Sequence, residues 1–176
     1  MSWTHLGDET RPANLTLPPA CQVVLIHTQA EADERIPPLL GKGPLVVHAV
    51  PRERVDLRRL LWRGEILDPL DTQNNMAAPL IDGLIVEGGD HPVHPDWVRS
   101  LRDQAVAAGV PFCFRGWGEW GPSPDAGLPE TLPTYGPSHH HYFDDPPHKV
   151  WRFGKDRSGR VLDGRTWDQT PEVDHA

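Results

Sequence analysis

Hydrophobic residues along the chain gather into four short runs that are separated by polar, glycine-rich and proline-rich segments. The runs cover residues 21–27, 45–50, 81–87 and 110–115. Continuous apolar runs of this length are typical of strands that are buried on both faces of a parallel sheet. The pattern therefore predicts four buried strands.

Helical signals follow the first two runs. Thr28 and Glu31 form a T-x-x-E capping box, which predicts a helix that begins there. Pro37 disturbs this helix, and we expect it to end by Gly41. After the second run, leucines and arginines over residues 55–64 predict a short basic helix.

The longest predicted helix follows the third run. Pro95 suits the first turn of a helix, and Gly109 is expected to end it. Between them, apolar side chains recur at four-residue spacing, at Trp97, Leu101 and Ala105. The alternation of strands and helices predicts an α/β fold, a half β/α barrel with about four parallel strands.

Composition divides the chain into segments. We expect a flexible N-terminal arm over residues 1–20, the half β/α barrel over 21–120, a Pro/Gly/His-rich loop over 121–148, and a closing module over 149–176. The closing module is loop-rich, basic and aromatic.

Bulk composition narrows the class of protein. A chain of 176 residues suffices for one domain with a substantial core. Its formal net charge of -8 argues against a protein that coats nucleic acid without sequence preference. Cys21 and Cys113 lie far apart, so no zinc site, disulfide framework or 4Fe–4S cluster is expected from this chain. No apolar run reaches the roughly 20 residues of a membrane span, and a signal peptide is not apparent. We expect a soluble, cytoplasmic protein that does not bind membranes.

The turn after the third run is the first candidate site, because ligands of α/β proteins bind at the carboxyl ends of parallel strands. Its sequence is Glu87-Gly88-Gly89-Asp90-His91. The paired glycines could let backbone amides approach a phosphate group or S-adenosylmethionine. The candidate cofactor-binding residues are therefore Gly88, Gly89, Asp90 and His91. The alternative is a plain tight turn, which a Gly-Gly pair favours on its own.

A divalent metal site is a second hypothesis. Four histidines fall at or just beyond the predicted strand ends: His27, His48, His91 and His94. Glu87 and Asp90 would supply carboxylates at the same edge, and imidazoles with carboxylates are common ligands of divalent metals. The alternative is that these histidines are solvated or hydrogen-bonded within the chain.

Histidines also cluster in the predicted loop. The metal-capable residues there are His139, His140, His141, Asp144, Asp145 and His148. Because such histidine runs bind metal adventitiously, a functional site is not favoured here. Trp117 and Trp120 are expected to plug the mouth of the sheet, and Glu119 between them is a candidate catalytic carboxylate, although a structural role is favoured.

The closing module combines cations with aromatic residues inside an acidic protein. Its candidate nucleic-acid-binding residues are Arg152, Lys155, Arg157, Arg160 and Arg165. Together with Trp151 and Trp167 they could grip a strand through phosphate contacts and base stacking. The alternative is that the tryptophans pack on the barrel while the arginines pair with acidic residues.

Ordered blocks of sequence carry a family resemblance. They are residues 32–37, 39–40, 55–57, 85–89, 94–104, 109–112, 117–120 and 159–167. Over about residues 21–171 the chain resembles the C-terminal half of a phage- and prophage-encoded, radical-SAM-like protein family of largely unknown function. The resemblance implies a barrel whose N-terminal half carries a three-cysteine motif for a 4Fe–4S cluster that cleaves S-adenosylmethionine.

This chain departs from that family at the residues that carry its chemistry. The cluster-bearing half and its cysteines are absent, and acidic residues at two strand ends are replaced by His27 and by Val50 before Pro51. Asp90 and His91 stand where the resemblance implies a Glu and an Arg. The framework is thus kept while the polar residues differ.

The resemblance and its departures together predict a degenerate, non-catalytic half-barrel that acts as a binding or assembly module. Such a chain should form a homo-oligomer or bind a protein partner that completes the barrel. One alternative is the C-terminal component of a split radical-SAM enzyme, or a rebuilt metal-dependent enzyme, acting on a nucleoside or nucleic acid. Another, suggested by the charge alone, is an acidic phage-encoded inhibitor of a host nucleic-acid-binding system.

Overall fold

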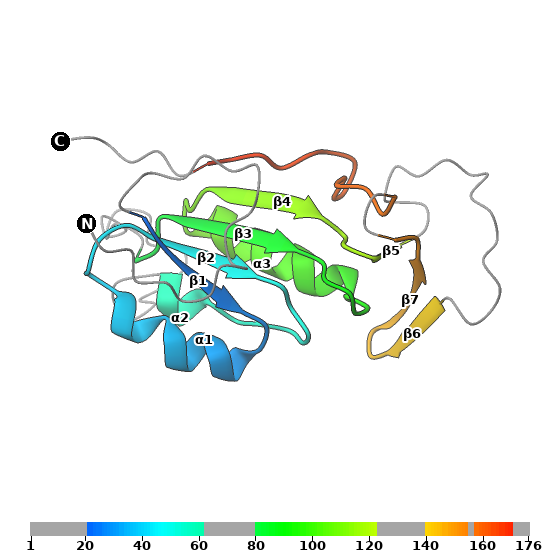
Figure 1. Cartoon of the computed structure of the whole chain (residues 1–176), viewed down its shortest axis with the longest axis horizontal. Helices are drawn as coiled ribbons and strands as arrows, with labels where there is room; N and C mark the ends of the chain where they lie inside the picture. The colour runs from blue at the N-terminus through cyan, green and yellow to red at the C-terminus, as the bar shows by residue number, and fades with distance from the viewer. Residues whose placement is uncertain (1–20, 62–79, 123–139, 155–156, 171–176) are drawn as a thin grey trace.

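The four hydrophobic runs form one parallel sheet in the computed structural model, which describes residues 21–61, 80–122, 140–154 and 157–170 (Figure 1). The strands are β1 (Gln22–Ile26), β2 (Leu45–Ala49), β3 (Gly83–Glu87) and β4 (Phe112–Gly116). Their order in the sheet, β1-β2-β3-β4, is their order in the chain, and all neighbours are parallel. Sequential parallel strands of this kind make up half of a β/α barrel, so the predicted α/β class with four parallel strands is confirmed.

Helices cover one face of this sheet. They are α1 (Gln29–Arg35), the 3-10 helix η1 (Pro37–Leu39), α2 (Arg58–Leu61) and α3 (Pro95–Ala107). Alternate strand residues such as Ile26, Val47 and Phe114 are buried in one cluster with Val98 and Leu101 of α3. The alternation follows from the period of two in a strand, which sends every second side chain to the same face.

The sequence signals for the helix ends are observed in the structure. Thr28 caps α1, because its Oγ1 accepts a hydrogen bond from the Glu31 amide at 3.2 Å. The Glu31 carboxylate accepts from the His27 amide at 2.6 Å, one residue before the position that a capping box uses. Pro95 opens α3 as predicted, and Gly109 follows its end with a φ of +67°.

A second, antiparallel sheet lies beyond the carboxyl ends of β3 and β4 (Figure 1). It contains β5 (Trp120–Pro122), β6 (His140–Asp144) and β7 (Pro147–Arg152) in the order β5-β7-β6. The sequence predicts a loop over 121–148, whereas the structure forms β6 and the start of β7 there. A run of histidines followed by Tyr142 and Phe143 hides the usual apolar–polar alternation of a strand, which explains the difference.

The C-terminal segment runs along the outer edge of β4. The Phe114 amide donates to the Trp167 carbonyl at 2.9 Å, and the Gln169 amide donates to the Phe112 carbonyl at 3.2 Å. The Gln169 side-chain oxygen accepts from the Phe112 amide at 3.1 Å, and Asp168 forms an antiparallel bridge with Cys113. One edge of the half-barrel is therefore covered by its own chain.

No helix among the described residues has the length and apolar character to cross a membrane.

Candidate functional site

Three polar side chains form a row on the sheet face opposite the helices. They are His48 of β2, Glu87 of β3 and Arg115 of β4, with 6%, 27% and 21% of their side chains exposed. Glu87 lies at the centre: its Oε2 is 3.8 Å from His48 Nε2 and 3.2 Å from Arg115 Nε. Below the row this face becomes apolar, where Val46, Ile85 and Cys113 are buried together.

The pleat and one irregularity bring this row together. Alternation places residues 48, 87 and 115 on the same face, and the pairing of β3 with β4 shifts register between Val86 and Glu87. Such irregularities re-aim side chains near strand ends. Glu87 therefore lies between side chains of both neighbouring strands: its carboxylate pairs with Arg115 of β4 and faces His48 of β2.

The buried thiol next to this row is not prepared as a nucleophile. Burial raises the pKa of the Cys113 thiol, and the nearby Arg115 and Arg160 guanidinium groups offset this only in part. The thiolate is the reactive form of cysteine, so a raised pKa disfavours nucleophilic chemistry at Cys113.

The glycine turn is explained by backbone packing. A Cβ on Gly88 would lie 1.9 Å from the Trp117 carbonyl oxygen, and one on Gly118, whose φ is +71°, would lie 2.3 Å from the Gly88 carbonyl oxygen. The Gly88 amide donates to the Gly116 carbonyl at 2.8 Å, and the Glu119 amide donates to the Gly89 carbonyl at 2.9 Å. The two glycines thus let the turn after β3 lie directly against the turn after β4.

The predicted cofactor residues Gly88, Gly89, Asp90 and His91 lie together in this turn, where Asp90 is exposed and His91 is half-buried. A hydrogen bond from His91 lowers the pKa of Asp90, and the other ring nitrogen of His91 lies 3.1 Å from the Pro51 carbonyl oxygen. The turn is therefore held by contacts within the chain. The carboxylate of Asp90 at its exposed end would repel an anionic ligand.

The amino end of α3 is also bonded within the chain, because the His94 side chain caps it. His94 is 1% exposed, and its Nδ1 accepts from the Asp96 amide at 3.0 Å. Its Nε2 donates to the Pro146 carbonyl at 3.0 Å, and these two contacts are satisfied together by the neutral Nε2–H tautomer. One of the amides that could bind a phosphate at this helix terminus is already bonded to His94.

The structure places the four predicted metal-ligand histidines in separate contacts. His27 Nδ1 lies 3.0 Å from Glu31, His48 faces Glu87, His91 lies beside Asp90, and His94 caps α3. Within the described ranges, no group of three or more His, Cys, Asp or Glu side chains is placed to hold a metal ion.

The two described histidines of the run at residues 139–141 lie on opposite faces of strand β6. His139 lies outside the described residues. The His140 ring is 5.4 Å from the Trp151 ring, whereas the His141 ring is 4.6 Å from the Phe143 ring. Neighbouring side chains in β6 point to opposite faces, so the two described histidines are not aimed at one site.

Most of the described cations of the closing module contact side chains of the same chain, within the module or outside it. Arg152 forms an ion pair with Glu119, and Arg160 forms one with Asp168. The Arg165 guanidinium lies 3.6 Å from the Trp167 ring centroid. Arg157 is exposed, and Lys155 lies outside the described residues. These contacts match the packing alternative more closely than an open nucleic-acid surface.

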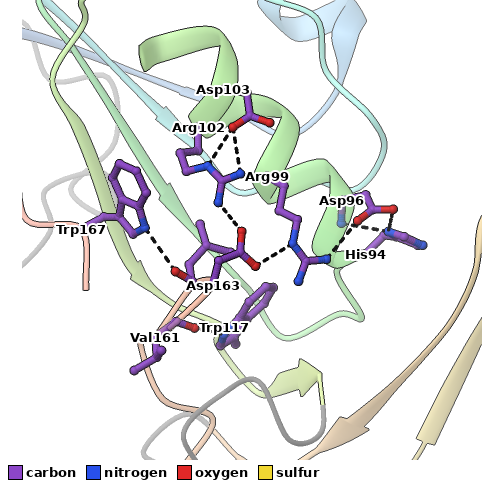
Figure 2. Close-up of polar contacts among 10 residues, drawn as sticks. His94, Asp96, Arg99, Arg102, Asp103, Trp117, Val161, Asp163 and Trp167 are labelled. Atoms are coloured by element: carbon purple, nitrogen blue, oxygen red, sulfur yellow. Dashed lines mark hydrogen bonds and ion pairs between the residues drawn. The ribbon is translucent and has the colours of Figure 1, made fainter. Parts of the chain in front are cut away.

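A group of contacts that the sequence did not predict fastens the closing module to α3 (Figure 2). Figure 2 shows the Asp163 carboxylate between the guanidinium groups of Arg99, whose Nε lies 2.8 Å away, and Arg102. Burial raises the pKa of Asp163, but hydrogen bonds from Arg102 and Arg99 outweigh it and hold the pKa below its ordinary value. The signal was present: Asp163-Gly164 lies between Leu162 and Arg165, and Asp-Gly favours a two-residue turn.

That turn positions its neighbours. Asp163 and Gly164 both have positive φ, 52° and 77°, and the Leu162 amide donates to the Arg165 carbonyl at 2.9 Å. Trp117 Nε1 donates to the Val161 carbonyl at 3.0 Å on the approach to the turn. The hairpin thus holds the C-terminal segment in place along β4.

A cavity of about 680 Å³ lies at the opposite end of the sheet from the predicted sites. Its lining combines the amino ends of β3 and β4, the end of α3 and the C-terminal segment: Ile81, Asp82, Val106, Gly109, Val110, Pro111, Asp168, Gln169 and Thr170. Because it is open and lies away from the carboxyl ends of the strands, it does not share the polar row.

A family model described as "Protein of unknown function (DUF5131)" matches residues 23–171. No curated protein and no solved structure matches the chain.

Proposed function

The chain belongs to the DUF5131 family, and we propose that it is a non-catalytic binding or assembly module built on half of a β/α barrel. In this proposal it derives from a phage-type, radical-SAM-like barrel and has kept the framework of that barrel while losing its chemistry.

The contact that carries the proposal is the ion pair between Glu87 and Arg115, beside His48. Barrel enzymes keep their reactive groups at the carboxyl ends of the strands. Here the central carboxylate at that end forms an ion pair with the Arg115 guanidinium at 3.2 Å, and the buried His48 imidazole lies 3.8 Å away, beyond hydrogen-bond distance. A carboxylate engaged by a guanidinium stabilises the sheet and is poorly placed to accept a substrate proton.

The neighbouring turn supports the same proposal. Gly88, which would let a backbone approach a cofactor, is packed against Trp117 and Gly118 instead. Both ring nitrogens of His94 form hydrogen bonds, one with the first turn of α3 and the other with the β6–β7 hairpin. The residues at the strand ends therefore join elements of the chain to one another.

Calorimetry and light scattering test the proposal together. We expect no heat on titrating S-adenosylmethionine into tag-free protein, and a mass above that of the monomer as the protein concentration rises. Heat of binding for S-adenosylmethionine would contradict the non-catalytic part. A strictly monomeric chain up to about 200 μM, above the Kd of typical specific complexes, would contradict self-assembly.

A second candidate is the C-terminal component of a split enzyme, which the position of the polar row favours. His48, Glu87 and Arg115 lie on the face opposite the helices, the face that the other half of a barrel would enclose. In that case the chain would bind S-adenosylmethionine with its barrel-completing partner. Glu87→Gln would then weaken the binding, whereas the exposed Asp103→Asn would not.

A further inference from the structure

Strand β6 forms the outer edge of the antiparallel sheet. The strand order is β5-β7-β6, and within the described parts of the chain no strand pairs with the free side of β6. Edge strands are normally protected by central charges, prolines or covering segments. The centre of β6, His141-Tyr142-Phe143, contains no proline and no Asp, Glu, Lys or Arg, and Tyr142 is 56% exposed.

The edge is held firmly by the body of the protein. The Phe143 ring lies 4.9 Å from His94 and 5.4 Å from Trp97 of α3. Val150, opposite His141 on β7, is fully buried. Tyr142 lies opposite Lys149, on the other face of the ribbon. A strand fixed in this way can accept a neighbour without first being ordered, which lowers the entropic cost of association.

We propose that β6 pairs antiparallel with β6 of a second copy of this chain, about a twofold axis at Tyr142. The inference rests on the proposed assembly function and names its surface. A twofold interface brings the same residues of both copies together, so the strand must be complementary to itself.

The sequence of β6 has this property. Pairing about Tyr142 places His140 opposite Asp144 of the other copy, and His141 opposite Phe143. The imidazole can donate a hydrogen bond to the carboxylate, and each of these pairs occurs twice. Aromatic and His–carboxylate neighbours of this kind stabilise antiparallel ladders.

The reverse orientation lacks this complementarity. A parallel pairing in register would place Asp144 against Asp144 and His140 against His140, and like charges directly opposite one another are unfavourable. The contact involves one five-residue strand per copy, and each copy carries a formal charge of -8. A small interface between like-charged copies makes a weak dimer, favoured by high protein concentration and by salt that screens the repulsion.

Disulfide trapping tests the register. In the proposed dimer residue 142 faces its own copy, so Tyr142→Cys should give a covalent dimer under mild oxidation. Asp144→Cys is the matched control, because residue 144 faces residue 140 and should remain uncross-linked. Wild-type protein controls for cross-linking through the native cysteines, the half-buried Cys21 and the buried Cys113. Equal cross-linking of both variants, or no cross-linking of Tyr142→Cys, would overturn the proposal.

Sedimentation equilibrium separates this inference from the proposed function. Tyr142→Lys should weaken self-association about tenfold or more, because two lysines would face each other at the axis. Val106→Lys is the control: Val106 is 54% exposed on α3, so the same charge there should leave association unchanged. Circular dichroism checks that both variants fold. If wild type associates and Tyr142→Lys associates equally well, the β6 edge is not the interface, while the assembly function stands.

Discussion

The parallel and the antiparallel sheet meet the same physical problem in different ways. Both leave an outer strand with backbone groups that need partners. Along β4 the chain supplies them itself, through Trp167 and Gln169 of the C-terminal segment. Along β6 the described residues supply none, and Tyr142 is exposed at its centre.

The difference indicates at which edge the proposed assembly would take place. A four-stranded half-barrel has two edges, and the β4 edge is closed by about one extra strand of the same chain. At the β1 edge, Arg35 Nη1 donates to the Leu25 carbonyl at 3.0 Å, and a charge of this kind discourages strand addition. Among the described residues, the appended antiparallel sheet, and not the barrel half, therefore presents the more accessible edge.

The junction between the two sheets should be the most sensitive to substitution. Gly88→Ala places a Cβ 1.9 Å from the Trp117 carbonyl oxygen, so the turns after β3 and β4 would be forced apart. We expect a loss of more than about 4 kcal/mol in the free energy of unfolding, or failure to fold. Gly109→Ala is the control: it meets no atom within 4 Å but has a φ of +67°, and should cost about 1 kcal/mol in urea unfolding. Similar losses for both would contradict the packing assigned to Gly88.

Removing the anchor of the C-terminal segment should reopen the β4 edge. Leu162 is fully buried before the Asp-Gly turn, so Leu162→Ala should cost about 3 kcal/mol in urea unfolding. The freed segment should also increase aggregation, which light scattering would detect. Val161→Ala, at a half-buried neighbour, should cost much less. An equally stable, non-aggregating Leu162→Ala protein would show that this anchor does not protect β4.

The contribution of the Asp163 charge to stability can be measured without changing the backbone of the turn. Asp163→Asn keeps a residue that tolerates positive φ but removes the charge between Arg99 and Arg102. We expect a loss of about 1 kcal/mol at pH 7, a value discounted for partial exposure.

This effect has a defined pH dependence. Because the folded-state pKa of Asp163 is lowered, its contribution is complete above the unfolded value of about 3.9 and is lost as pH falls through the folded value. The difference between wild type and Asp163→Asn in urea unfolding should therefore be constant above about pH 5 and shrink in acid. A difference that grows as pH falls would have the wrong sign for this account.

The smallest effect concerns the β1 edge. Arg35 is 47% exposed, so Arg35→Ala should change the free energy of unfolding by no more than about 0.5 kcal/mol. Self-association measured by sedimentation should also stay unchanged if β6 is the interface. Stronger association of Arg35→Ala would point to β1 as a competing edge.

The sequence was informative wherever local signals decide the structure. Four apolar runs identified the parallel strands, and Thr28 and Pro95 marked the starts of α1 and α3. These signals act within a few residues, so tertiary contacts had little to override. Membership of a family of unknown function agrees with the resemblance in part, while its phage and radical-SAM aspects stay predictions.

The site depended on contacts that sequence spacing does not encode. His48, Glu87 and Arg115 come from three strands, and their meeting follows from register and the irregularity at Glu87. Asp163 reaches Arg99 and Arg102 across more than 60 residues of chain. Strand β6 was missed because its histidines suggest metal binding or a loop, although its neighbours on β7 make it a strand.

Amide hydrogen exchange at two protein concentrations tests the contrast between the two edges most directly. At low concentration we expect slow exchange at Phe112 and Phe114, whose amides are bonded to the C-terminal segment, and faster exchange at the outward-facing amides of β6. Raising the concentration should slow exchange in β6 and leave Phe112 and Phe114 unchanged. Exchange in β6 that does not depend on concentration, or rapid exchange at Phe114, would contradict the account.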